Sequence, residues 1–69
     1  MKLSARNQLA AQVTSVEEGA AIANVVLDVN GQRLVASITV EAVRELGLEA
    51  GTAVTAMVKA SDVILATED

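Results

Sequence analysis

The chain has 69 residues, of which 52% are apolar, and its net charge is −4. It contains no aromatic residue, no cysteine and no histidine. A chain this short buries only about 60% of its unfolded surface, and without disulfides or Cys/His zinc sites we expect self-association to cover the apolar surplus. The lack of aromatic side chains for base stacking, together with the negative charge, argues against a nucleic-acid partner.

Alternating apolar and polar residues predict three β-strands in the first forty positions. The first strand is expected at Gln8–Val16 and is followed by a turn at Glu17–Gly19. The second is expected at Ala20–Val29. Asn30-Gly31 comes next, which is a strong hairpin signal. The third strand, Gln32–Val40, then completes this hairpin.

The period changes after the third strand, and a helix of about two turns is predicted. Thr39 is the expected N-cap, Glu41 lies in the first turn, and Gly47 suits the left-handed position past the end. Alternation resumes at Thr52–Val58, and a last strand is expected at Val63–Thr67.

This order of elements predicts an all-β fold: a five-stranded, OB-fold-like Greek-key barrel with one short helix between strands three and four. Without proline or a Gly/Ser-rich linker, residues 1–69 are expected to form a single domain. A two-sheet sandwich of similar strands is the alternative.

Catalysis is not expected, because without Cys and His neither a Cys–His pair nor a Ser–His–Asp triad can form. A Ser–Lys pair at Lys59 and Ser61 is possible by position, but so small a barrel has little room for a substrate cleft. We therefore predict neither a catalytic cofactor nor a metal-cation site.

No apolar run approaches the roughly 20 residues that span a bilayer. No secretory signal follows Met1, so a cytoplasmic location is expected.

The few cations indicate a different kind of site. We interpret Arg33 and Arg44 as solvated charges. Arg6 stands in Ser4-Ala5-Arg6-Asn7, and Lys59 in Lys59-Ala60-Ser61, so each has a hydroxyl two residues away. Both segments lie where a strand begins or ends, which leaves backbone N–H groups available. Cations, hydroxyls and amides together are what a tetrahedral dianion requires.

The whole chain resembles the molbindin (Mop) family and the related molybdate-binding TOBE domains. The likeness rests on segments at compatible spacing rather than on one decisive motif. They are Ser4–Gln8, Glu18-Gly19, Ser37–Thr39, Glu45–Leu48 with Gly51, and Val58–Val63.

The resemblance implies an OB-type barrel that assembles as a hexamer, a trimer of dimers, and holds molybdate or tungstate at subunit interfaces. It implies a cytoplasmic role in molybdenum storage or buffering. By matching position, the site residues would be Ser4, Ala5 and Arg6 of one subunit with Lys59, Ala60 and Ser61 of its neighbour. Thr39 matches a position that usually carries a hydroxyl, whereas Ala42 stands where relatives often have Ser. The family's second kind of site, near the three-fold axis, is assigned no residues in this chain.

Two alternatives remain open from the sequence. One is a barrel that serves only as an interaction or assembly module, although such a module has no reason to bring Arg6 and Lys59 together. The other is a fragment of a molybdate-responsive regulator or transporter subunit. The start at Met1, three residues before Ser4, favours a free-standing protein.

Overall fold

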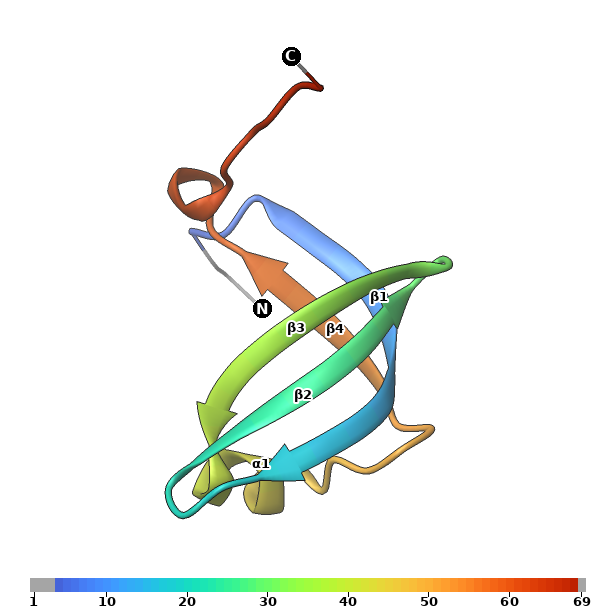
Figure 1. The fold of residues 1–69 in the computed structure, drawn as a ribbon, viewed down its shortest axis with the longest axis vertical. Coiled ribbons are helices and arrows are strands. Elements are labelled where there is room, and N and C mark those ends of the chain that lie inside the picture. Colours follow the sequence, from blue (N-terminus) through green and yellow to red (C-terminus); the bar gives the residue numbers. More distant parts are fainter. Residues whose placement is uncertain (1–3, 69) are drawn as a thin grey trace.

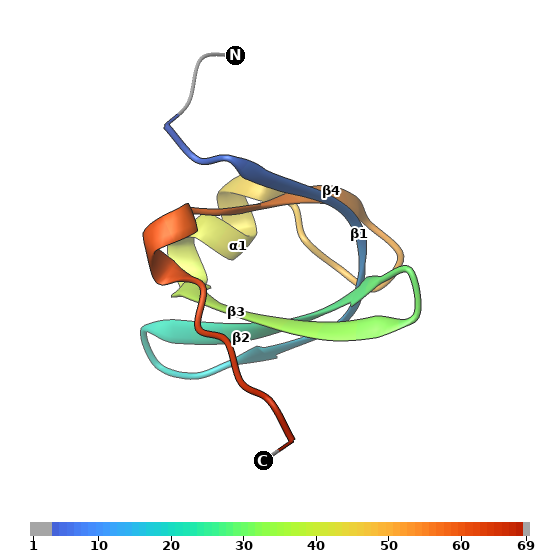
Figure 2. The same cartoon turned by 90° about the horizontal axis from the view of Figure 1, so that it is seen from above.

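A four-stranded antiparallel sheet and one short helix make up the computed structural model, which describes residues 4–68. The strands follow the order β3-β2-β1-β4 across the sheet. The sheet curls, so that β1 and β4 lie opposite β2 and β3, and α1 covers one end of the barrel (Figures 1 and 2). The elements in chain order are β1 (Asn7–Glu18), β2 (Ile22–Val29), β3 (Gln32–Thr39), α1 (Val40–Leu46), β4 (Ala53–Val58) and the 3-10 turn η1 (Ala60–Asp62).

Strand β1 is the longest element because it is shared between two neighbours. Its first half pairs with β4, and its second half pairs with β2. The register shifts between Val13 and Ser15, and the Thr14 hydroxyl donates a hydrogen bond to the Val26 carbonyl at 3.1 Å. A bulge of this kind bends the strand, which lets β1 pass from one layer of the barrel to the other.

The predicted first turn begins later than expected. Glu17 and Glu18 remain in β1, paired with Asn24 and Ala23 of β2. The turn is closed by the Gly19 N–H, which donates to the Ile22 carbonyl at 2.8 Å. Cross-strand pairing therefore overrides the local preference of two adjacent glutamates for a turn.

The other local signals are confirmed. Asn30 and Gly31 both have positive φ, 50° and 89°, as a type I′ hairpin turn requires. The Thr39 hydroxyl accepts a hydrogen bond from the Ala42 N–H at 3.0 Å and so caps α1. Gly47 has a φ of 64°, and its N–H and that of Leu48 donate to the last carbonyls of the helix, which is a Schellman ending.

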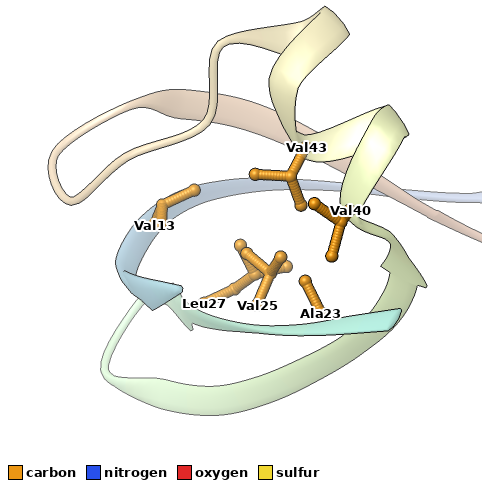
Figure 3. Packing of buried hydrophobic residues seen from close by; sticks show 6 residues of the cluster. All are labelled: Val13, Ala23, Val25, Leu27, Val40 and Val43. Carbon is orange, nitrogen blue, oxygen red and sulfur yellow. The ribbon is translucent and has the colours of Figure 1, made fainter. Parts of the chain in front are cut away.

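The core lies between the strands and the inner face of α1 (Figure 3). It is built from aliphatic residues alone, consistent with a chain that has no aromatic side chain. The Val40 N–H donates to the Ala21 carbonyl at 2.9 Å, which fixes the start of α1 against the β1–β2 turn. The buried members are Val13, Ala23, Val25, Leu27, Val40 and Val43.

The prediction of a fifth strand at Val63–Thr67 was wrong. Residues 63–68 are not a strand, and the sheet has four strands within the described part of the chain. The turn η1 redirects the chain after β4, and the segment that follows runs away from the barrel (Figure 1). Ile64 and Leu65 are 92% and 88% exposed. The all-β barrel with its helix between the third and fourth strands is nevertheless confirmed.

Candidate functional site

The pairing of β1 with β4 brings the two predicted anion-binding segments to one end of the barrel. The last pair of this ladder is Asn7 with Val58, and the Asn7 side-chain amide donates to the Val58 carbonyl at 3.1 Å. Because the strands are antiparallel, Ser4–Arg6 enters the ladder where Lys59–Ser61 leaves it (Figures 1 and 2). Arg6 and Lys59 are the next residues beyond this last pair, and both lie just outside the strands.

The groups gathered at this end have the chemistry of an anion site. Arg6 and Lys59 are both exposed, as are the hydroxyl-bearing residues Ser4 and Ser61. The two hydrogen bonds of η1 are donated by the N–H groups of Asp62 and Val63. The N–H groups of Ala60 and Ser61, which precede them, have no hydrogen-bond partner among residues 4–68. Two cations, two hydroxyls and two free amides can together satisfy the charge and the oxygens of a tetrahedral dianion.

The structure also shows that a single chain places both segments at the same end. The resemblance implies that Lys59–Ser61 come from a neighbouring subunit, whereas within one chain Lys59 directly follows the strand that pairs with the start of β1. Asn7 contributes to this arrangement, because its amide fixes the start of β1 against the end of β4. Its role was not predicted. The only signal for it in the sequence was a polar amide residue at the start of an alternating strand.

Thr39 lies at the opposite end of the barrel. It pairs with Ile22, at the end where α1 and the β1–β2 turn lie (Figure 1). A shallow depression there is lined by Thr39, Arg44 and two carboxylates, Glu41 and Glu45. Arg44 is already paired with Glu18 at 3.4 Å. Because Thr39 and Arg6 lie at opposite ends of the barrel, Thr39 can join Arg6 only from another subunit.

Ala42, the departure from the resemblance, lies in the first turn of α1 beside Thr39. The missing hydroxyl therefore belongs to the helical end of the barrel, and Ser4, Arg6 and Lys59 are unaffected by it.

No group of three acidic, His or Cys side chains within residues 4–68 could hold a metal ion. In the same part of the chain, no helix has the length and apolar character to cross a membrane.

The fold and this end of the barrel define a small OB-type module with a cationic, hydroxyl-bearing edge. Residues 3–65 match the TOBE domain, and the chain belongs to this family. It is 42% identical over 69 residues to a probable molybdenum-pterin-binding protein of Haemophilus influenzae. The aligned region covers 99% of this chain and 100% of that protein. The predicted family resemblance is thereby confirmed.

Two solved structures are similar to the whole chain. A molybdate-binding protein from Sporomusa ovata has a TM-score of 0.93 and 42% identity, covering 97% of this chain and 100% of its own. The cytoplasmic molybdate-binding protein ModG, solved with molybdate bound, has a TM-score of 0.88 and 45% identity, covering 93% of this chain and 46% of its own. These relatives confirm the OB-type fold class.

Proposed function

We propose that this protein binds molybdate, and tungstate as its close analogue, as an intact oxyanion. The observation that carries the proposal is the Asn7–Val58 pairing, which gathers Ser4–Arg6 and Lys59–Ser61 at one end of β1 and β4. Arg6 and Lys59 neutralise the double charge, while hydroxyl and amide groups bind the oxygens. The molybdate bound in the related ModG supports this choice of ligand.

We further propose that the anion lies between subunits of a homo-oligomer, a hexamer built as a trimer of dimers. Both cations are exposed in the single chain, so a facing subunit would be needed to remove the anion from water. The facing subunit supplies Thr39 if its helical end is turned toward Arg6. Such an oligomer serves as a cytoplasmic molybdenum store or buffer.

The ligand is the oxyanion rather than a pterin. The Haemophilus influenzae relative is named as a molybdenum-pterin-binding protein. A pterin ring is expected to stack on aromatic side chains. This chain has no aromatic residue, and its candidate site consists of charged and hydrogen-bonding groups. A binding protein, rather than an enzyme, fits such a site, because Ser61 and Lys59 lie on an exposed turn without an enclosed cleft.

Isothermal titration with molybdate, tungstate and sulfate tests the proposal. Molybdate and tungstate are expected to bind tightly and sulfate weakly, because the larger anions fit a site that selects by size. Arg6→Ala removes one charge-assisted interaction of about 1.5–3 kcal/mol, which corresponds to a loss of roughly 10- to 150-fold in affinity. The matched control is Arg33→Ala on β3, which makes the same change in net charge away from the site.

The control is expected to keep the parent affinity. Equal losses in Arg6→Ala and Arg33→Ala would show only a general effect of charge and would refute the proposed site. Absence of heat with every oxyanion, from a folded oligomer, would instead identify the barrel as an interaction module without a ligand.

A further inference from the structure

The tip of the β2–β3 hairpin, at the right of Figure 1, contains a chemically reactive peptide bond. This bond joins Asn30 to Gly31, and both residues are exposed. The backbone nitrogen that follows an asparagine can attack the carbon of the side-chain amide. A glycine in the following position leaves the approach free, because it has no Cβ.

The reaction that this pair permits is deamidation. The Gly31 nitrogen loses its proton and forms a bond to Cγ of Asn30. The bond from Cγ to the side-chain nitrogen breaks, and that nitrogen takes up a proton and leaves as ammonia. The product is a cyclic succinimide, which water opens at either of its carbonyls. Aspartate or isoaspartate then replaces the asparagine at position 30.

The folded hairpin restrains this reaction in two ways. Asn30 and Gly31 have φ values of 50° and 89°, which a type I′ turn between the paired Val29 and Gln32 requires. Attack on Cγ requires Asn30 to rotate about its Cα–C bond, out of the turn conformation. In addition, the Gly31 N–H donates to Oδ2 of Asp28 at 3.4 Å. A carboxylate thus holds the proton that must leave, and its charge opposes formation of an amide anion.

The other two asparagines of the chain lie in different surroundings. Asn24 lies within β2 and is paired on both sides, with Glu17 of β1 and with Ser37 of β3. The side-chain nitrogen of Asn7 donates to the Val58 carbonyl at 3.1 Å. Neither residue is followed by glycine, so both are internal references for the rate at Asn30.

We propose that Asn30 is a site of spontaneous deamidation, and that the Asp28 carboxylate on the Gly31 N–H slows the reaction in the folded protein. Isoaspartate adds a methylene to the main chain and so breaks the geometry of a two-residue turn. The β2–β3 pairing, which includes the buried Val25 and Leu27, is then weakened. Neither Asn30 nor Asp28 belongs to the proposed anion site, so this inference is independent of molybdate binding.

Incubation at mildly alkaline pH, followed by proteolysis and mass spectrometry, measures the amide lost at each asparagine. Loss at Asn30 is expected to precede loss at Asn7 and Asn24, and to be faster in concentrated urea than in the folded protein. Asp28→Ala should raise the folded-state rate by roughly 2- to 10-fold, the factor that corresponds to one hydrogen bond. The matched control, Glu45→Ala on α1, makes the same change in net charge and should keep the parent rate.

In urea, Asp28→Ala and the parent should react at the same rate, because the hydrogen bond to Gly31 is absent from the unfolded chain. Equal folded-state rates in Asp28→Ala and Glu45→Ala would refute the role of Asp28. Equal rates for the parent with and without urea would refute control by the hairpin, and an intact Asn30 in urea would refute the site itself.

A second variant tests the consequence for stability. Asn30→Gly keeps the positive φ of the turn and has no amide to lose. After incubation, the parent is expected to unfold at a lower urea concentration than fresh protein, whereas Asn30→Gly should be unchanged. Equal losses in the two would show that deamidation at Asn30 does not weaken the hairpin.

Discussion

Replacement of a single core valine should remove a large part of the stability of this barrel. Val25 is 2% exposed and lies in the core with Val13 and Val43 (Figure 3). Val25→Ala deletes two buried methyl groups, worth about 1.6 kcal/mol in transfer free energy. The residual cavity adds roughly 1 kcal/mol, for a total loss of about 2–3 kcal/mol. A chain of this size has about 3–10 kcal/mol to lose.

Urea unfolding followed by far-ultraviolet circular dichroism measures this loss, since a chain without Trp or Tyr provides no intrinsic fluorescence signal. Protein concentration is kept constant, because association shifts apparent stability. The matched control, Val35→Ala, makes the same chemical change at a residue that is 45% exposed and should lose about 0.5 kcal/mol or less. Equal losses in the two variants would refute the assignment of Val25 to the core.

Two further predictions concern the ends of α1. Thr39→Ala removes the acceptor for the Ala42 N–H and should lower the unfolding free energy by about 1 kcal/mol. Thr39→Ser should retain most of that stability in the same urea titration, whereas equal losses would argue against capping. Gly47→Ala forces an alanine to a φ of 64° and should reduce stability by about 1–2 kcal/mol. Gly47→Asn should lose less, and thermal unfolding that ranks the two in reverse would contradict the left-handed assignment.

Features set by neighbouring residues could be predicted from the sequence. The hairpin at Asn30-Gly31 and the helix between Thr39 and Gly47 depend on backbone conformations and caps that each residue favours on its own. The end of β1 could not be predicted in this way. Glu17 and Glu18 extend the strand only because β2 offers them partners.

The candidate site divides along the same line. The sequence alone showed its cations, Arg6 and Lys59, each with a hydroxyl residue two positions away. Their presence at one end of a single chain became visible only through the long-range pairing of Asn7 with Val58, which are 51 positions apart. The resemblance grouped Thr39 with them, but the pairing of Thr39 with Ile22 places it at the opposite end of the barrel.

The sequence by itself determined the fold class, the order of the elements, the turns and the kinds of group available to an anion, because these follow from local conformational preference and periodicity. Only the tertiary structure decided which strands are neighbours, where β1 bends, and whether residues 63–67 join the sheet. The apolar run at Val63–Ala66 has the composition of a strand. Whether it joins the sheet depends on the direction in which η1 sends the chain, which is a property of the folded molecule.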